Sequence, residues 1–407
     1  MKRNLKVNNS TRRGIFKLLW VFLFSFFVTR KTKADLIISD FEKSTGFRNY
    51  GLPSKFEKIF RWIIANPSLK GNGVSYTPLN KLSGSLVPNG LHFERHQHGV
   101  KEINPELYEL VINCFNKKEK FSLKRLRSFE FVTHKTFIEC GGNSNVLYNK
   151  EPIKSSVDHI HGLFSVSEWT GIVLKDLLKS YLNKINKNTW LEFTSYDKGN
   201  YNISLPLIRV LDKAILCLYQ NGEPIRPEQG YPVRLVIPGF EGSTHVKWLR
   251  KISFRNGPVF SRNETSRYTD LLPNGKSRQF SFVMELKSTI LQPTHGDVLK
   301  KGKIVISGLA WSGDSNIKQV EVSKNSGKSW KSAKIDEKKS KIVRFFYSFE
   351  WNGEEIILQS RCIDENNKIQ PSRKEFLKKM GYNAYYHFNG ITSWKINSDG
   401  SVEHVYV

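Results

Sequence analysis

Cysteine is scarce in this sequence, and the few cysteines present form no recognisable redox or metal pattern. The 407 residues include four cysteines, Cys114, Cys140, Cys217 and Cys362. None belongs to a CxxC pair, which argues against a zinc site and against a thioredoxin-like redox motif. No CxxCH is present either, so no c-type haem is attached to this chain. The wide spacing of the cysteines does not suggest a disulfide framework.

Acidic residues are also few relative to basic ones. The chain has 64 Lys and Arg against 37 Asp and Glu, a formal charge of +27. No RNA-binding signature, zinc-finger spacing or long basic block accompanies this charge, so nucleic acid is not expected as a partner. Two interpretations stay open: a field that attracts anions or an acidic partner protein, or a merely solvated basic surface.

The N-terminal apolar run is too short to span a bilayer comfortably. It extends from Leu18 to Val28, about eleven residues where about 20 are needed. Arg12 and Arg13 precede it, and a small residue, Ala34, follows a second basic group. This layout predicts a twin-arginine signal over residues 1–34, with an ordinary secretory signal as the alternative. We therefore expect export to the periplasm and no membrane span in the mature protein.

The length and the strand pattern predict two domains after that signal, because single cores tend to split above about 250–300 residues. From about residue 285 onward, short alternating strands are separated by Gly/Asn turns such as Asn325–Gly327. This spacing is typical of a β-sandwich of immunoglobulin type. The expected boundaries are 35–284 for the first domain and 285–407 for the second.

The stretch Thr133–Asn143, THKTFIECGGN, stands out in the first domain. A predicted strand from Phe129 to Ile138 delivers Cys140 to its end. Gly141 and Gly142 follow, and we expect them to turn the chain sharply by adopting positive φ. A thiol on such a loop suits a ligand or a nucleophile, although a free cysteine is also commonly just buried.

Two further segments gather cationic and hydrogen-bonding side chains near predicted turns. The loop Gly90–Gly99, GLHFERHQHG, contains Arg95 and three histidines, which would suit either a metal or an anionic ligand such as phosphate. The segment Gly230–Leu249 contains a strand, a Pro-Gly turn, and then His245 and Lys247. By contrast, the apolar spacing of Gly171–Leu182 predicts an amphipathic helix whose apolar residues belong to the core.

Together these blocks resemble the sulfite oxidase family of molybdenum enzymes, and within it the sulfane dehydrogenases of sulfur oxidation. The quoted matches are CGGN at Cys140, RHQHG at Arg95, GYPVRLVIPG at Gly230, HVKW at His245, and LAWSG at Leu309 followed by VEVS and GKSW. They occur in the family's order along nearly the whole mature chain. Within the family, FERHQHGVKEINPELYELVI, ETSRYTDLLPNGK and NAYYHFNGITSW are similar to the sulfane dehydrogenases.

The resemblance implies an α+β fold, with a mixed α/β molybdopterin-binding domain followed by an immunoglobulin-like dimerisation domain. It also implies a molybdenum–molybdopterin cofactor, with Cys140 as the catalytic thiolate ligand of molybdenum, a soft donor that suits this metal. The residues implied to hold the pterin and its phosphate are Arg95, His96, Gln97, His98, Asp197, Arg234, His245, Val246 and Lys247. Gln229 stands where sulfite oxidases carry a cofactor-binding histidine.

Three departures from the family pattern concern the substrate. Sulfite oxidases place an arginine shortly after the CxGN motif, where Ser144 and Asn145 stand here. The expected active-site tyrosine is replaced by Leu218, with Tyr219 displaced by one position, and Thr244 replaces an arginine before His245. Losing two arginines disfavours a pocket for the small sulfite dianion and suits sulfur attached to a larger carrier.

The resemblance therefore implies an oxidoreductase that oxidises sulfane sulfur, a persulfide or thiosulfonate on a carrier protein, and passes electrons to a c-type cytochrome subunit. The alternative enzyme is a sulfite dehydrogenase acting on free sulfite. A homodimer through the C-terminal domain is expected, with a heterotetramer as the alternative assembly. Two other possibilities are an oxo-abstracting reductase, which would lack residues 285–407, and a non-catalytic exported binding protein.

Overall fold

The computed structural model describes residues 53, 54 and 56–407. The signal predicted over residues 1–34 lies outside the described residues. Residues 59–407 form one compact unit, and the description that follows concerns this unit. Within the described residues, no helix combines the length and the apolar character needed to cross a membrane.

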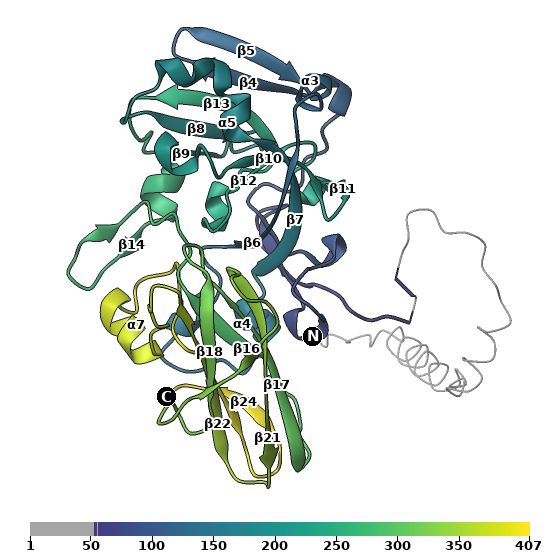
Figure 1. Cartoon of the computed structure of the whole chain (residues 1–407), viewed down its shortest axis with the longest axis vertical. Coiled ribbons are helices and arrows are strands. Elements are labelled where there is room, and N and C mark those ends of the chain that lie inside the picture. Colours follow the sequence, from purple (N-terminus) through teal and green to yellow (C-terminus); the bar gives the residue numbers. More distant parts are fainter. Residues whose placement is uncertain (1–52, 55) are drawn as a thin grey trace, which may run out of the picture. The chain divides into compact units, whose positions relative to one another are not determined.

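The described part before residue 285 contains three sheets of three or more mostly antiparallel strands, with short helices between them (Figure 1). The first sheet has the order β1 (Trp62–Ala65), β2 (Gly73–Tyr76), β3 (Glu94–His96). The second runs β11 (Glu223–Pro224), β10 (Ile215–Gln220), β7 (Phe164–Val173), β6 (Val132–Glu139), with β12 (Arg234–Val236) paired to β10. The third runs β5 (Lys117–Ser122), β4 (Glu109–Cys114), β13 (Leu249–Arg255), β8 (Trp190–Ser195), β9 (Asn202–Pro206).

Strand β4 illustrates how the sequence pattern produces these sheets. Its residues ELVINC alternate between buried and half-buried positions, because successive side chains of a strand point to opposite faces. Leu110, Ile112 and Cys114 are fully buried. They face a core whose other members include residues of β8 and β13.

The helix predicted over Gly171–Leu182 is only partly present. Residues up to Val173 belong to β7, where Gly171 pairs with Cys217 of β10. The helical part is a single turn, α5 (Leu174–Leu177), followed by a 3-10 segment over Lys179–Lys184. Pairing in the sheet therefore overrode the helical spacing at the start of the segment. The other short helices of this part are α3 (Leu123–Leu126), α4 (Val157–His161) and α6 (Leu207–Val210).

The part after residue 285 is the expected β-sandwich of two antiparallel sheets. One sheet has the order β16 (Lys287–Gln292), β17 (Gly302–Trp311), β21 (Ile342–Trp351), β20 (Lys334–Ile335). The other runs β19 (Lys331–Ser332), β18 (Ile317–Ser323), β22 (Ile356–Asp364), β23 (Ser393–Ile396), β24 (Val402–Val405). Helix α7 (Arg373–Met380) packs on this part, and a small hairpin of β14 (Asp270–Leu271) and β15 (Ser277–Arg278) precedes it. The expected fold class, a mixed first part followed by a β-rich second part, is confirmed.

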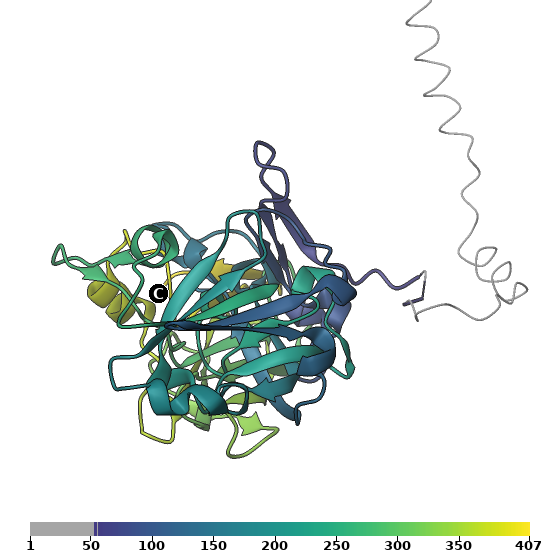
Figure 2. The same cartoon turned by 90° about the horizontal axis from the view of Figure 1, so that it is seen from above.

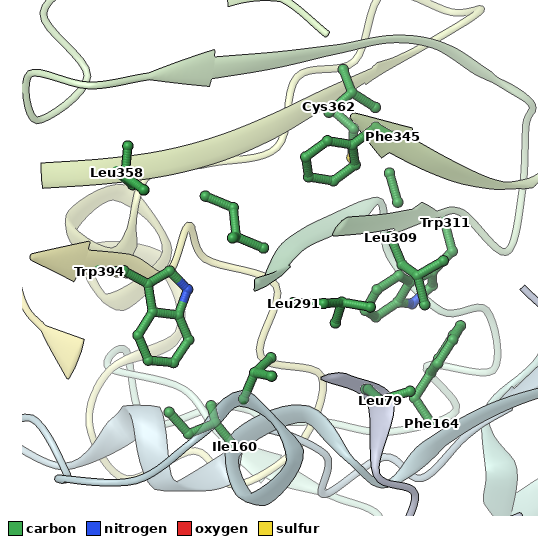
Figure 3. Packing of buried hydrophobic residues seen from close by; sticks show 14 of the residues in the cluster. Leu79, Ile160, Phe164, Leu291, Leu309, Trp311, Phe345, Leu358, Cys362 and Trp394 are labelled. Atoms are coloured by element: carbon green, nitrogen blue, oxygen red, sulfur yellow. The ribbon is translucent and has the colours of Figure 1, made fainter. Parts of the chain in front are cut away.

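One hydrophobic core crosses the expected boundary at residue 285. Its buried members include Leu79, Ile160 and Phe164 from the first part and Leu291 and Trp311 from the sandwich. Figure 3 shows these side chains next to one another. The rings of Phe164 and Trp311 lie 4.2 Å apart between centroids. The two parts therefore share an apolar interface, while the boundary itself stays a prediction.

A buried ion pair accompanies this shared core. The Lys287 ammonium lies 3.1 Å from a carboxylate oxygen of Glu139, and both side chains are almost fully buried. The Trp311 indole N–H donates to the other Glu139 oxygen at 2.7 Å. Strand pairing sets Lys287 opposite Trp311, so that β16 and β17 present both groups to the end of β6. Burial lowers the pKa of Lys287, and the Glu139 carboxylate opposes that shift.

We expect Lys287→Met to lower the free energy of unfolding by about 3–5 kcal/mol, because Glu139 would keep a buried charge without its partner. Denaturant unfolding followed by circular dichroism would measure the change. The matched control is Lys368→Met, which removes an ion pair with Glu285 made by a more exposed lysine. The control should cost less than about 1 kcal/mol. Similar small losses for both variants would refute a stabilising role for the buried pair.

Candidate active site

Cys140 stands at the end of β6, directly after Glu139. Its backbone N–H donates to the Leu163 carbonyl at 3.0 Å, and its own carbonyl accepts from the Asn143 N–H at 2.8 Å. The Asn143 side chain bonds both Glu139, at 2.9 Å, and the Leu163 N–H, at 3.1 Å. The thiol is thus carried on a tight turn that neighbouring strands hold at both ends.

The two glycines of this turn do not adopt the positive φ that we expected. The left-handed residue of the turn is Ser144, with φ of 67°. Gly141 is instead required by a close approach: a Cβ there would lie 2.4 Å from a carboxylate oxygen of Glu241. The Gly141 carbonyl accepts from the His387 N–H at 2.8 Å, so the C-terminal part also contacts this turn.

Ser144 faces away from the thiol and into the protein. Its hydroxyl accepts from the Lys287 ammonium at 2.7 Å and lies 2.7 Å from the His161 ring. Lys287 therefore joins Glu139 and Ser144, the residues on either side of the Cys140 turn. This network connects the sandwich to the site through hydrogen bonds as well as through apolar packing.

A cavity opens beside Cys140, with about 790 Å³ of space free of protein atoms, its open mouth included. Strand β3 contributes Arg95 and His96, and strand β12 contributes Arg234. All ten residues predicted for the site line this one cavity, namely Arg95, His96, Gln97, His98, Cys140, Asp197, Arg234, His245, Val246 and Lys247. Gln229 lines it too. The individual roles of these residues stay predictions.

The three histidines of the Gly90–Gly99 loop have separate surroundings. The His92 ring is buried against the Phe93 carbonyl, the His96 ring lies 2.7 Å from Glu94, and His98 is exposed. Among the described residues, no group of three or more His, Cys, Asp or Glu side chains is placed to hold a metal ion. Of the two ligands considered for this loop, the geometry favours the anion.

Arg234, which is buried, and Lys247, which is half-buried, bring positive charge to the cavity beside Arg95. The Arg234 guanidinium bonds only neutral acceptors, the Gln229 carbonyl at 2.9 Å, the Gln229 side chain at 3.1 Å and the His245 carbonyl at 3.3 Å. The Lys247 ammonium contacts the carbonyls of Arg95 and Glu228 and the His96 ring. Within the described part of the chain, neither Arg234 nor Lys247 forms a salt bridge with a carboxylate.

Burial lowers the pKa values of these groups, and for Lys247 and His245 the nearby Arg234 guanidinium adds to the shift. Burial, and next the nearby Arg234 guanidinium, lower the pKa of Lys247 to about 7. Burial likewise lowers the pKa of Arg234 to about 10 and that of His245 to about 3. An anion in this cavity would stabilise both cations, because an opposite charge nearby favours the ionised form.

The cavity fits a pterin cofactor that carries a phosphate. The Nε atom of Arg234 is buried without a hydrogen-bond partner, and so is Nε2 of His92. The unpaired Arg234 N–H and two cations that form no salt bridge among the described residues suit an anionic, hydrogen-bonding ligand of this volume. Cys140 at the inner end would supply a soft sulfur ligand for a metal.

A second cavity meets the first at Cys140. It has about 1430 Å³ of space free of protein atoms, including its open mouth, and the two cavities share Arg95, Gln97, Cys140 and Tyr268. Tyr385 and Tyr386 of the C-terminal part line it, held by bonds from their N–H groups to Asp270 at 2.8 and 3.1 Å. Among the residues that the structure describes, no Asp or Glu lines this second cavity.

The tyrosines were missed as site residues in the sequence analysis. Burial raises the pKa values of Tyr76, Tyr268, Tyr385 and Tyr386 further above the ordinary value of about 10, at which a phenol is already neutral at physiological pH. The segments ETSRYTDLLPNGK and NAYYHFNGITSW, already noted as family-like, contain three of the four. Because those segments lie far from Cys140 in the sequence, only the folded chain places them beside it.

The positions at which the sequence departs from the sulfite oxidase pattern lie in different parts of the structure. Asn145 lines the second cavity, whereas Ser144 does not. Leu218 is buried in the core, and the Tyr219 ring packs on Phe131 at 5.9 Å between centroids, outside both cavities. The Thr244 hydroxyl donates to the Glu241 carbonyl at 2.7 Å and thereby holds the turn before His245.

Comparison with known proteins agrees with this geometry. Residues 97–263 match the oxidoreductase molybdopterin binding domain, and residues 278–393 match the Mo-co oxidoreductase dimerisation domain. The crystal structure of the sulfane dehydrogenase SoxCD from Paracoccus pantotrophus superposes with a TM-score of 0.83 at 35% identity, covering 89% of this chain and 96% of that chain.

Curated relatives are more distant in sequence. Mitochondrial sulfite oxidase of Rattus norvegicus is 26% identical over 312 residues, which cover 70% of this chain and 57% of the relative. Sulfite oxidase of Gallus gallus is 28% identical over 314 residues, covering 70% and 68%. The chain thus spans 57% and 62% of the length of the rat and mouse enzymes.

The matched domains indicate a molybdenum–molybdopterin cofactor, and the second matched domain is one that dimerises. Cys140 lies within the first matched domain, and the cationic cavity lies within and beside it. Two tyrosines of the second cavity, Tyr385 and Tyr386, belong to the second matched domain. The chain belongs to the sulfite oxidase family of molybdenum enzymes.

Proposed function

We propose that this protein is a molybdenum-dependent dehydrogenase that oxidises sulfane sulfur bound to a carrier protein and passes the electrons to a c-type cytochrome. The observation that carries this proposal is the second cavity, which opens widely onto Cys140 and carries Asn145 in the stretch where sulfite oxidases place an arginine, with Arg95, Arg267 and tyrosines around it. The similarity to a sulfane dehydrogenase supports the same substrate class.

The first cavity would hold the cofactor. Arg234, Lys247 and His245 would bind its phosphate and polar edge, and Cys140 would bind molybdenum. When bound, the cofactor supplies oxygen-atom transfer and a two-electron redox centre. The chain's own residues orient it: the turn fixed by Asn143 and Glu139 holds the thiolate at one end, while the cations of the cavity hold the anionic end.

The second cavity would admit the substrate. Arg95 and Arg267 lie on its wall and would attract the persulfide anion toward Cys140. Each oxygen atom added to sulfur comes from one water molecule, and two protons and two electrons leave. Because a cytochrome haem accepts single electrons, the two would leave in successive steps. The phenols of Tyr268 and Tyr385 can donate hydrogen bonds to the oxygens formed on sulfur.

Export by the twin-arginine route to the periplasm belongs to this proposal, as does a homodimer formed through residues 285–407. The first rests on Arg12 and Arg13 and the second on the matched dimerisation domain. Free sulfite is the second candidate substrate, favoured by the relatives among sulfite oxidases and by the retained Arg95.

The decisive experiment combines metal analysis with substrate comparison. The purified protein should contain molybdenum and pterin and should reduce cytochrome c with a persulfidated carrier protein far faster than with sulfite. Cys140→Ser should lower that rate by at least about 100-fold, since even groups behind a metal ligand commonly contribute 10–100-fold. The control Cys362→Ser changes a buried thiol of the sandwich and should stay near the wild-type rate. A higher kcat/KM for sulfite than for the carrier would favour the second candidate.

Asn145→Arg should raise kcat/KM for sulfite by about 10-fold or more, because it adds a charge-assisted hydrogen bond in the second cavity. Steady-state cytochrome c reduction would measure it. Ser144→Arg is no equivalent change, since Ser144 is buried against Lys287, and it should destabilise the protein instead. An unchanged sulfite rate in a folded Asn145→Arg protein would show that this position does not determine selectivity.

Anion binding to cofactor-free protein should depend on pH through Lys247. Its pKa of about 7 means that the empty cavity carries less positive charge above pH 7, while a bound anion restores the proton. Sulfate affinity should therefore fall by up to about tenfold per pH unit above pH 7. Thermal shift titrations with sulfate between pH 6 and 9 would measure this.

Lys247→Met should bind sulfate more weakly and with little pH dependence. Lys318→Met, which changes an exposed lysine of the sandwich, should behave as wild type. If wild type, Lys247→Met and Lys318→Met all showed the same pH dependence, sulfate would be stabilising the protein as a general salt effect and not by binding at Lys247.

A further inference from the structure

The sheet of β1, β2 and β3, whose purple strands project from the body of the protein in Figure 2, places a carboxylate behind the cofactor cavity. Glu94 and His96 occupy alternate positions of β3, so their side chains point to the same face of the strand. His96 lines the first cavity, whereas Glu94 is not among the described residues that line either cavity. Glu94 therefore acts on a ligand in the cavity only through a neighbouring side chain or through its charge.

The His96 ring connects this carboxylate to Lys247. Its Nε2 atom lies 2.7 Å from Oε2 of Glu94, and its Nδ1 atom lies 3.0 Å from Nζ of Lys247. A charged lysine only donates hydrogen bonds, so Nδ1 must accept and carries no proton. Burial, and next the charge of Lys247, lower the pKa of His96, which keeps the ring neutral at pH 7. The single ring proton then resides on Nε2 and is donated to Glu94.

Glu94 stays ionised in this position because two groups outweigh the effect of burial. Its other carboxylate oxygen accepts from the Arg61 guanidinium, which also donates to the His92 carbonyl at 3.1 Å. Burial raises the pKa of Glu94, but the hydrogen bond from His96 and the charge of Arg61 lower it to about 2. A charged acceptor at Nε2 fixes the tautomer of the ring, as carboxylates do behind metal-bound histidines.

The Lys247 ammonium has two acids and several cationic or neutral groups around it. Burial lowers its pKa most, the cations Arg234 and Arg95 lower it further, and the acids Glu94 and Asp197 raise it. Of the two acids, Glu94 has the larger effect. The other groups facing the ammonium include the neutral rings of His92, His96 and Trp248 and the carbonyls of Arg95 and Glu228.

We propose that Glu94 is a positioning residue of the cofactor cavity: through the His96 ring it holds the Lys247 ammonium in place and keeps it charged for the anionic end of the cofactor. This proposal rests on the proposed function, since it takes the first cavity as the site of an anionic cofactor. An ammonium has no preferred direction of its own, so acceptors of fixed orientation determine where its charge lies.

Glu94→Gln tests this role because it removes the charge and keeps the size of the side chain. The probe is sulfate, which stays a dianion between about pH 5.5 and 9, and its affinity for the cofactor-free full-length protein is measured by thermal shift titration. The matched control is Glu321→Gln. Glu321 pairs with Arg361 in the sandwich, and its side chain has the same 15% exposure as that of Glu94. Circular dichroism of each variant checks folding.

In Glu94→Gln the fall in sulfate affinity should begin about one pH unit lower than in wild type, a shift that one nearby opposite charge commonly produces. At pH 8 the variant should therefore bind sulfate about tenfold more weakly. At pH 5.5, where Lys247 is charged in both proteins, it should bind at least as tightly as wild type, because an acid has been removed. Glu321→Gln should follow the wild-type profile throughout.

Two double variants complete the design. Adding Glu94→Gln to Lys247→Met should leave the pH dependence of Lys247→Met unchanged, because the effect passes through Lys247. Should Glu94→Gln alone fail to fold, Arg61→Gln combined with Glu94→Gln removes both charges of the pair and leaves no guanidinium without its carboxylate. The same displaced profile is expected for that protein.

Weaker sulfate binding by Glu94→Gln at every pH would overturn the proposal, because it would indicate a merely structural role. An unchanged profile, absence of sulfate binding by wild type, or the same displacement in the Lys247→Met background would overturn it too. A displaced profile in a protein whose molybdenum-loaded form oxidises no persulfide would support the role of Glu94 and refute the proposed function. An unchanged profile in an active persulfide dehydrogenase would refute the role of Glu94 alone.

Discussion

The ion pair between Lys287 and Glu139 is the constraint on which the site depends. A buried ammonium and a buried carboxylate are costly to desolvate, so each must keep its partners. Those partners, the Trp311 indole and the side chains of Asn143 and Ser144, lie in both parts of the chain. The turn that carries Cys140 therefore cannot move without disturbing the sandwich. In this protein the C-terminal part is a component of the site's scaffold as well as a domain of the dimerising type.

Two cavities with different electrostatic character meet at that turn. One is deep and cationic, with Arg234 and Lys247 held among neutral partners. The other is wide and is lined by neutral tyrosines together with Arg95 and Arg267. Only a few side chains, Cys140 and Arg95 among them, belong to both. This arrangement separates the binding of an anionic cofactor from the entry of a bulky substrate and leaves the thiol at their junction.

Residues that looked alike in the sequence have different places in the fold. Ser144 and Asn145 both occupy the stretch where the family carries an arginine, but a left-handed Ser144 turns inward to Lys287 and leaves Asn145 on the cavity wall. Gly141 is needed for the close approach of Glu241 rather than for a positive φ. Both outcomes depend on side chains about 100 or more residues away, which local spacing cannot reveal.

The sequence by itself determined the class of fold, the alternating strands of the sandwich and the set of residues around the cofactor cavity. The sandwich strands follow from local periodicity, whereas the residues around the cofactor cavity were implied by the resemblance of the motifs to the sulfite oxidase family. Only the tertiary structure decided which tyrosines line the second cavity, that Tyr219 is not among them, and that Lys287 supports the Cys140 turn. These relations arise between segments far apart in the chain, because burial, ion pairing and strand register are set by the packed fold as a whole.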